Sequence, residues 1–385
     1  MNAPQLLASG ETLSPSASVD TKIAVVLGTR PEIIKLGPVI ALLGDRCRVI
    51  HTGQHYDEKL AHTFFEAFGI DVEPEVVSVG GKSRGAQIGA TTSSLTAHFE
   101  SSRPTAVIVQ GDTNSTAGAS LAANACELPL IHVEAGLRSH DRRMPEEHNR
   151  VIADHLSDLC LAPTEVSAKN LVTEGIPRSR IVVTGNTVVD AVTALTPGPA
   201  VRQSFLTRHS VEPGAFVLST FHRPENVDDP DRLRSIIDEL AGFDLPVLLP
   251  LHPRTVKQAE KNEIAVDKGS IRRLGPIGYV EFLSLLAECA IAVSDSGGVQ
   301  EEVSVLKRPM VVVRNSTERP EVIGTFCRLV QPGPDIGLAA GEMLELHPFD
   351  STDLRTIPSP YGDGDAAEKS VTAIDDLLGQ TALDD

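Results

Sequence analysis

The sequence predicts an α/β protein with two doubly wound, Rossmann-like parallel sheets that face each other across a cleft. Three observations predict this class. Short apolar runs, typical of strands buried on both faces, alternate with helical segments along the whole chain. The connections are short, and polar or glycine-containing motifs fall where the expected strands end. A length of 385 residues is also long for a single domain.

The first half is expected to be a Rossmann-like domain over residues 21–196. Its predicted strands are the apolar runs at 22–27, 48–52, 75–79, 105–110, 130–133, 158–162 and 180–184. Helical spacing follows at 33–43, after 56 as far as about 68, at 87–99, at 115–124 and from Pro145 onward. Pro31 fits a first helical turn, where its missing N–H has no role. Residues 1–20 contain no Lys or Arg, so we expect a disordered tail rather than a signal peptide.

The second half is expected to begin after Pro197-Gly198-Pro199, which breaks the alternation and is the predicted linker. A second Rossmann-like domain follows over residues 201–365. Its predicted strands lie at 216–220, 246–249, 271–274, 289–294 and 310–313, and its helices at 231–241, 281–288 and 299–306. Residues 366–385 contain a final helix at about 367–378.

The composition excludes several classes of partner. A formal net charge of -18 argues against nucleic acid and anionic membranes, and 4% aromatic residues without Trp argue against base stacking. No apolar run approaches the roughly 20 residues of a membrane span. The five cysteines form no CxxC pair and lie mostly in apolar runs, which favours a reducing, cytoplasmic location. HExxH, GxGxxG and Walker A motifs are missing, so we expect no metal and no cofactor.

Acidic residues at strand ends are the first candidates for catalysis. Asp112 and Glu134 follow apolar strands, and Glu146 opens a helix. Carboxylates in a desolvated cleft can have their pKa values pushed apart, so that one acts as a base and another as an acid. Asp112 and Glu146 could instead cap helices. The three together favour acid/base chemistry.

Basic residues in the same loops are candidates for binding an anionic substrate. They are Arg30, Lys35, Arg138, His222, Arg223, His252 and Arg319. Lys35 would lie one helical turn from Arg30, but it could instead be a solvated surface lysine. His252 could be a structural histidine.

A glycine-containing turn, Ser296-Gly297-Gly298, connects a predicted strand to a predicted helix. The absence of Cβ atoms lets the backbone approach a ligand, and the N–H groups of the helix favour an anion such as a diphosphate. Glu302, in the first turns of that helix, could accept hydrogen bonds from two ribose hydroxyls or simply complement the helix dipole.

These motifs together resemble the non-hydrolysing UDP-N-acetylglucosamine 2-epimerases. The motifs, found in order from about residue 22 to the last helix, are Gly28-Thr29-Arg30-Pro31-Glu32, Gly111-Asp112-Thr113, His132-Val133-Glu134-Ala135-Gly136-Leu137-Arg138, Pro145-Glu146-Glu147, the run from Asp295 to Glu302, and Thr317-Glu318-Arg319-Pro320-Glu321. The resemblance implies a glycosyltransferase-B-type fold, a final helix that returns to the first domain, and a homodimer. It also implies interconversion of UDP-N-acetylglucosamine and UDP-N-acetylmannosamine without a cofactor.

The resemblance further implies roles for the candidate residues. UDP leaves carbon 1 as a carboxylate takes the proton from carbon 2; UDP then re-adds to the 2-acetamidoglucal while a proton reaches the opposite face. Asp112, Glu134 and Glu146 would exchange these protons, and His222 would assist the departing diphosphate. The residues implied to hold the UDP-sugar are Arg30, Lys35, Ser296, Gly297, Gly298, Glu302 and Arg319, with Ile277 and Phe282 beside the uracil.

The chain departs from this family where many members bind a second, activating substrate molecule through two glutamines. Gln54 is kept, but the second position is Asp57, whose charge is unfavourable beside a diphosphate. We therefore expect hyperbolic kinetics. The alternatives left open are a hydrolysing epimerase that releases N-acetylmannosamine, an epimerase of a diacetamido uronic acid nucleotide, a sugar transferase of the same fold, and a non-catalytic UDP-sugar-binding protein.

Overall fold

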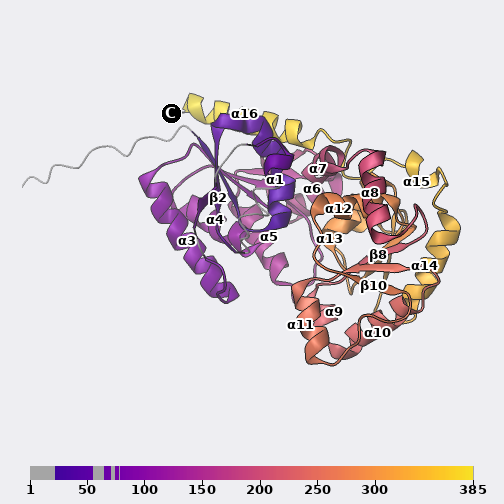
Figure 1. The fold of residues 1–385 in the computed structure, drawn as a ribbon. Helices are drawn as coiled ribbons and strands as arrows, with labels where there is room; N and C mark the ends of the chain where they lie inside the picture. The colour runs from indigo at the N-terminus through magenta and orange to yellow at the C-terminus, as the bar shows by residue number, and fades with distance from the viewer. Residues whose placement is uncertain (1–21, 55–64, 71–73, 78, 385) are drawn as a thin grey trace, which may run out of the picture.

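The computed structural model describes residues 22–54, 65–70, 74–77 and 79–384. Two separate parallel sheets form its core, each with helices packed against it (Figure 1). In β1 (Ile23–Leu27), the first strand of the chain, alternate residues enter different apolar clusters, so both faces of the strand are buried. The predicted fold class is confirmed. The predicted tail and Asp57 lie outside the described residues.

The first sheet has seven strands in the order β3-β2-β1-β4-β5-β6-β7. The strands after β1 are β2 (Cys47–His51), β3 (Glu75–Val76), β4 (Val107–Gln110), β5 (Leu130–Val133), β6 (Leu159–Ala162) and β7 (Ile181–Val183). Its helices are α1 (Arg30–Leu43), α3 (Arg84–Ser101), α4 (Asn114–Ala125), α5 (Pro145–Leu156), α6 (Glu165–Thr173) and α7 (Thr187–Leu195), with short 3₁₀ turns at Gly44–Arg46 and Arg178–Arg180.

The second sheet has six strands in the order β10-β9-β8-β11-β12-β13. They are β8 (Val217–Thr220), β9 (Val247–Pro250), β10 (Ile271–Leu274), β11 (Ile291–Ser294), β12 (Met310–Val313) and β13 (Cys327–Val330). The helices of this half are α8 (Pro199–His209), α9 (Pro224–Val227), α10 (Pro230–Ala241), α11 (Pro253–Lys261), α12 (Tyr279–Glu288), α13 (Gly297–Leu306), α14 (Asp335–Leu346) and α15 (Asp353–Thr356), with a 3₁₀ turn at Pro320–Val322. The last helix, α16 (Ala366–Asp384), lies against α1 and α7 of the first half (Figure 1).

Several elements were not predicted, and each has a local reason. The edge strand β13 carries an exposed Arg328 inside its apolar run, which hides the pattern of a buried strand. Helix α7 is rich in β-branched residues, which favour strands. Helix α8 begins at Pro199, inside the predicted linker, and packs against α12. The other unpredicted helices are α6, α9, α11, α14 and α15.

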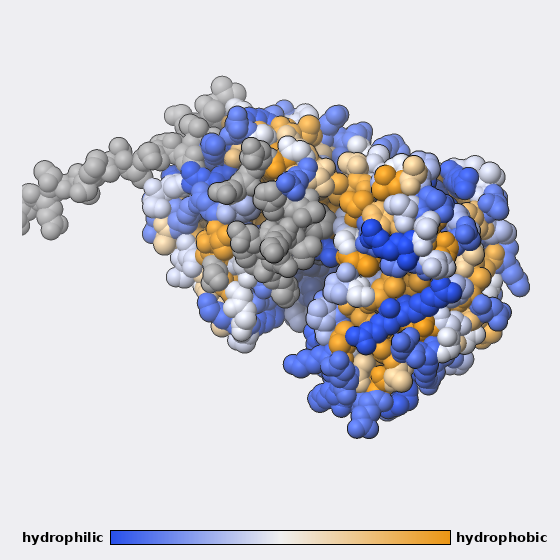
Figure 2. Space-filling model, in the orientation of Figure 1, coloured by the Kyte–Doolittle hydropathy of each residue, from blue (hydrophilic) through white to orange (hydrophobic). Residues whose placement is uncertain are grey.

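The described helices include none with the length and apolar character needed to cross a bilayer. All five cysteines are free and buried, as predicted. A notch separates the two halves on the face shown in Figure 2. Candidate residues from both halves lie in the loops at the junction between them.

Candidate active site

Each sheet reverses its strand order once, and several of the candidate residues lie in or next to the loops that follow the strands at these points. The order reverses between β1 and β4 in the first sheet and between β8 and β11 in the second. Open parallel sheets bind ligands at such switch points, beyond the carboxyl ends of the strands. The loops after β1, β4, β8 and β11 carry residues 28–29, 111–113, 221–223 and 295–296.

A buried carboxylate holds the two switch-point loops of the first sheet together. One oxygen of Glu32 accepts hydrogen bonds from the Gly28 N–H (3.0 Å) and the Thr29 hydroxyl (2.8 Å). The other accepts from the Thr113 hydroxyl (2.8 Å), beside Asp112. Burial raises the pKa of Glu32 to about 7 despite these donors. Sequence reasoning placed Glu32 only inside a motif and gave it no role.

Asp295 plays the same part in the second sheet. Its carboxylate is fully buried and accepts from the backbone N–H groups of His222 (3.1 Å) and Arg223 (3.0 Å) and from the Asn226 amide (3.2 Å). The His222 ring also lies beside it, with Nδ1 at 3.4 Å from Oδ1. Loss of solvent lowers the pKa of His222, although Asp295 opposes this shift. The loop after β8 is thereby fixed with His222 at the junction.

Glu134 lies at the centre of the junction. Its backbone has φ of +68°, a left-handed conformation that is rare and strained for a residue other than glycine. Its carboxylate pairs with Lys35, accepts from the Asn186 amide (2.9 Å) and lies 3.6 Å from the guanidinium of Arg319. Burial would raise the pKa of Glu134, but Lys35 and Arg319 outweigh it and the pKa is lowered. Glu134 is therefore held as a carboxylate.

Glu301 on α13 shares the same partners from the other half. Its carboxylate lies 2.8 Å from Lys35 Nζ, 2.7 Å from Arg319 Nε and 3.0 Å from the Asn186 amide. Burial raises the pKa of Glu301 in spite of the two cations. The sequence did not single out Glu301, because Glu301 and Glu302 are adjacent and only the helix orientation decides which faces the junction. Lys35 is buried, so the surface-lysine alternative is wrong.

Asp112 joins a second set of charges. It forms an ion pair with Arg150 of α5, which also lies 2.7 Å from Glu147 and 3.8 Å from Glu318. Burial would raise the pKa of Asp112, but Arg150 outweighs it and the pKa is lowered. The cap of α4 is Thr113, so Asp112 does not serve as a simple helix cap. Arg150 and Glu318 were not predicted as site residues.

Glu318 gathers arginines from both halves. Besides Arg150, it pairs with Arg319, lies 2.8 Å from Arg314 and lies 3.4 Å from Arg223. These cations hold the pKa of Glu318 well below its ordinary value, against the effect of burial. Four arginines therefore surround one carboxylate at the junction, in a protein whose net charge is -18. An anionic substrate can bind there despite the acidic surface.

The glycine turn is shaped by this charge cluster. A Cβ on Gly297 would lie 2.7 Å from Arg319 Nη1 and 2.8 Å from Glu318 Oε1, so only glycine lets these side chains reach the start of α13. Gly298 is less crowded: its nearest such contact is Glu302 Oε1 at 3.9 Å. A Cβ on Gly298 would therefore make only an ordinary contact, and the approach of a ligand to this turn stays a prediction.

Glu302 faces Tyr279 and Arg30 at the other end of the turn. Oε1 accepts from the Tyr279 hydroxyl (2.8 Å), and the Arg30 guanidinium lies 5.9 Å from the centre of the Tyr279 ring. Oε2 is buried without a hydrogen-bond partner among the described residues. Burial raises the pKa of Glu302 to about 7. Tyr279 thus already donates to one oxygen of Glu302, and the contact with two ribose hydroxyls stays a prediction.

This arrangement predicts that UDP binding depends on pH. A ribose hydroxyl that donates to Glu302 requires the carboxylate, and half of the Glu302 side chains carry a proton at about pH 7. We therefore expect UDP to bind about tenfold more weakly at pH 6 than at pH 8, with proton release near neutrality. Titration calorimetry in buffers of different ionisation enthalpy measures both quantities.

The control for this prediction is Glu302→Gln, because UDP itself titrates near pH 6. The variant should keep only the pH dependence of the phosphate. If the two proteins show the same pH dependence, Glu302 does not contact the ligand through a titrating oxygen.

The remaining predicted residues lie apart from the central charges. Arg138 is buried, and its guanidinium is engaged by Asp154 (2.7 Å) and Glu174 (2.6 Å) rather than aimed at the junction. His252 is exposed, and its Nδ1 accepts from the Arg254 N–H (3.2 Å), as the structural alternative predicts, while its ring lies near His222. Half-buried residues complete the set: Glu146 in the first turn of α5, and Ile277 and Phe282 beside the apolar core.

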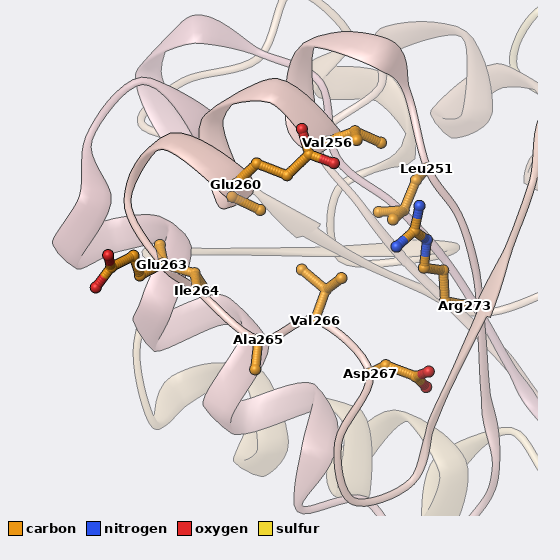
Figure 3. A pocket seen from close by; sticks show the side chains of 10 residues that line it. Leu251, Val256, Glu260, Glu263, Ile264, Ala265, Val266, Asp267 and Arg273 are labelled. Atoms are coloured by element: carbon orange, nitrogen blue, oxygen red, sulfur yellow. The ribbon is translucent and has the colours of Figure 1, made fainter.

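A cavity of about 380 Å³ lies beside α11 and β10 (Figure 3). It is lined by residues near β9, α11 and β10, among them Val256, Ile264, Val266 and Arg273. None of the predicted site residues lines it. Within the part of the chain that the structure describes, no group of three His, Cys, Asp or Glu side chains is placed to hold a metal ion.

Known proteins match the chain over most of its length. The family model described as UDP-N-acetylglucosamine 2-epimerase matches residues 44–375. The UDP-N-acetylglucosamine 2-epimerase of Methanocaldococcus jannaschii is 35% identical over 365 residues, which cover 91% of this chain and 98% of the relative. A Pseudomonas aeruginosa UDP-2,3-diacetamido-2,3-dideoxy-D-glucuronate 2-epimerase is 35% identical over 78% of this chain and 86% of its own.

Solved structures agree with this result. The M. jannaschii UDP-GlcNAc 2-epimerase in complex with UDP-GlcNAc and UDP has a TM-score of 0.82 at 36% identity, over 92% of this chain and 99% of that one. The Neisseria meningitidis UDP-GlcNAc 2-epimerase bound to UDP-GlcNAc has a TM-score of 0.83 at 30% identity, with the same coverage. The family resemblance and the glycosyltransferase-B-like fold inferred from the motifs are confirmed. This chain belongs to the UDP-N-acetylglucosamine 2-epimerase family.

Proposed function

We propose that the protein interconverts UDP-N-acetylglucosamine and UDP-N-acetylmannosamine, without hydrolysis, through UDP and 2-acetamidoglucal. The observation that carries this proposal is the state of Glu134. It is an ionised carboxylate, 7% exposed, whose lowered pKa results from Lys35 and Arg319 at the junction between the halves. A buried carboxylate of this kind can accept a proton from carbon 2 while water is excluded.

The chemistry divides between the two sides of the junction. In the first half-reaction the bond between carbon 1 and UDP breaks, the proton of carbon 2 moves to a carboxylate, and a double bond forms between the two carbons. In the second, UDP adds back to carbon 1 and a proton reaches the other face of carbon 2. Two carboxylates on different loops, Asp112 and Glu134, are the proposed groups for these two transfers, with Glu146 as the third candidate. The pKa values of Asp112 and Glu134 are both lowered, so the one that delivers a proton must first gain it in the complex with substrate.

The proposed UDP site lies on the second half. Arginines that now surround Glu318 would balance the diphosphate, and His222 would assist its departure from carbon 1. The backbone of α13 would receive the phosphates at its N-terminus. The residues proposed for the UDP-sugar are Arg30, Arg223, Ile277, Phe282, Ser296, Gly297, Gly298, Glu302 and Arg319. Residues 21–196 and 201–365 are the corresponding proposed domains.

The substrate itself has one competing candidate. The P. aeruginosa relative named above acts on a diacetamido glucuronate, by its name, and is as similar in identity as the M. jannaschii epimerase. UDP-N-acetylglucosamine is favoured because the M. jannaschii relative matches 98% of its own length and the Pseudomonas relative 86%. A homodimer in the cytoplasm completes the proposal; the five free cysteines support the location.

The test is to incubate the protein with UDP-N-acetylglucosamine in D₂O and to follow the sugar by NMR. We expect UDP-N-acetylmannosamine that carries deuterium at carbon 2, with no net release of UDP. Stoichiometric release of UDP and free N-acetylmannosamine would contradict the proposal and identify a hydrolysing epimerase. If the protein does not react with UDP-N-acetylglucosamine but converts the diacetamido uronic acid nucleotide, that nucleotide is its substrate.

A further inference from the structure

Behind the candidate carboxylates lies a buried histidine whose two ring nitrogens both face acceptors. His132 on β5 is completely buried. Its Nε2 lies 2.8 Å from the carbonyl oxygen of Gly111, and its Nδ1 lies 2.6 Å from Oδ1 of Asp154. A carbonyl oxygen can only accept, so Nε2 carries a proton. The charge of the ring then depends on Asp154.

Asp154 is held as a carboxylate. Its second oxygen lies 2.7 Å from the Arg138 guanidinium and accepts from the Gly136 N–H (3.3 Å). Burial would raise the pKa of Asp154, but His132 and Arg138 outweigh it and the pKa is lowered. An ionised Asp154 needs a donor at Nδ1, so His132 carries a proton on both nitrogens.

The groups around the ring do not offer a competing charge. Cys160 on the neighbouring strand β6 pairs with His132 in the register of the sheet, and burial raises the pKa of its thiol, which stays neutral. The cation of Arg138 lies on the far oxygen of Asp154 and is itself paired with Glu174. The charges therefore alternate from Glu174 near the surface to the imidazolium of His132 inside the sheet.

The imidazolium fixes the loop that carries Asp112. Gly111 donates its N–H to the Val133 carbonyl (3.1 Å) and accepts from His132 at its own carbonyl. Both polar groups of Gly111 are thus bound to β5, directly before Glu134. These two bonds tie the residue before Asp112 to the strand that ends directly before Glu134.

We propose that His132, held between the Asp154 carboxylate and the Gly111 carbonyl, is a positioning residue that keeps Asp112 and Glu134 in the geometry needed for proton exchange at carbon 2. This inference rests on the proposed function. It also assigns Arg138 and Asp154 to the support of the site rather than to contact with substrate.

The charge is tested on the unmodified protein. Long-range ¹H–¹⁵N spectra of protein labelled at its histidines, recorded at the pH of the activity assay, should show one ring that carries a proton on both nitrogens, as the acceptors beside the two ring nitrogens of His132 require. His51 is an internal control, since its Nδ1 accepts from the Gly53 N–H (2.9 Å) and burial lowers its pKa to about 4, so it should be neutral. If no ring carries both protons in this spectrum, the proposal is overturned, whatever the activity.

The positioning role is tested with Asp154→Asn, which removes the charge and keeps the size. We expect kcat to fall roughly 10- to 100-fold with KM changed less than about threefold, and the doubly protonated signal to disappear. Asp158→Asn is the matched control, because Asp158 accepts from the Leu130 N–H at the opposite end of β5 (2.9 Å); its kcat should stay unchanged. A folded Asp154→Asn protein with unchanged kcat overturns the role. If the Asp154→Asn variant does not fold, the histidine spectrum of the unmodified protein still tests whether His132 carries both protons.

Failure of the proposed function gives a different result. In that case the unmodified protein would not exchange the proton of carbon 2 in D₂O, although the spectrum could still show the charged ring. An active enzyme with a neutral His132 would overturn only the present inference.

Discussion

Replacing Glu134 by glutamine is expected to lower kcat by about 10²- to 10⁴-fold, the usual contribution of a general base or acid. Glutamine cannot accept the proton of carbon 2, and it also leaves Lys35 with one carboxylate partner instead of two. Deuterium incorporation at carbon 2 should fall in parallel with epimerisation. Affinity for UDP should change much less, because the proposed diphosphate contacts lie on the other half.

The control for Glu134 is Glu127→Gln. Glu127 also has a positive φ (+54°), so both substitutions place glutamine in left-handed backbone, but Glu127 is exposed before β5. The Glu127→Gln variant should retain full activity. If Glu134→Gln stays within about threefold of the unmodified enzyme, Glu134 is not a proton-transfer group, and Asp112 and Glu146 become the remaining candidates.

Much of the fold could be predicted because buried parallel strands have an unmistakable pattern. Strands β5, β10 and β12 have the predicted ends, and most of the others differ by one or two residues. The candidate loops could be placed for the same reason: the end of an apolar run is the end of a strand. Glu134 and Asp112 were singled out by position alone, and the structure brings both to the junction.

The partners of these residues could not be predicted, since ion pairs join residues far apart in the sequence. Glu134 lies 99 residues from Lys35. Arg150 stands in a segment that reads as an ordinary polar helix, and Glu318 stands in a family motif that gave it no role. Nothing local shows that either residue is buried. Arg138 was assigned to substrate because it ends a motif, yet its donors turn toward Asp154 and Glu174. Sequence position shows which loop a residue occupies, whereas the orientation of its side chain depends on packing.

Replacing Arg319 by methionine should destabilise the protein by about 3–5 kcal/mol, the effect of leaving buried charges without their partner. Arg319 is 5% exposed and lies against Glu301 (2.7 Å), Glu134 (3.6 Å) and Glu318. Urea denaturation measures the loss. Arg328→Met is the matched control: Arg328 pairs with Glu342 at 2.8 Å, but both are more than half exposed, so its effect should stay within about 0.5 kcal/mol.

The loss of stability in Arg319→Met should also depend on pH, and the protonation of Glu301 determines whether it grows or shrinks as the pH rises. The pKa of Glu301 is already raised by burial in the folded protein, and removal of Arg319 raises it further. The folded variant then binds more protons than the unfolded chain, so its stability falls as pH rises. We expect a larger deficit at pH 8 than at pH 5.5, and a partial recovery in Arg319→Met combined with Glu301→Gln. An equal deficit at both pH values would mean that Arg319 does not compensate the charge of Glu301, and that the two halves are joined at this point by packing alone.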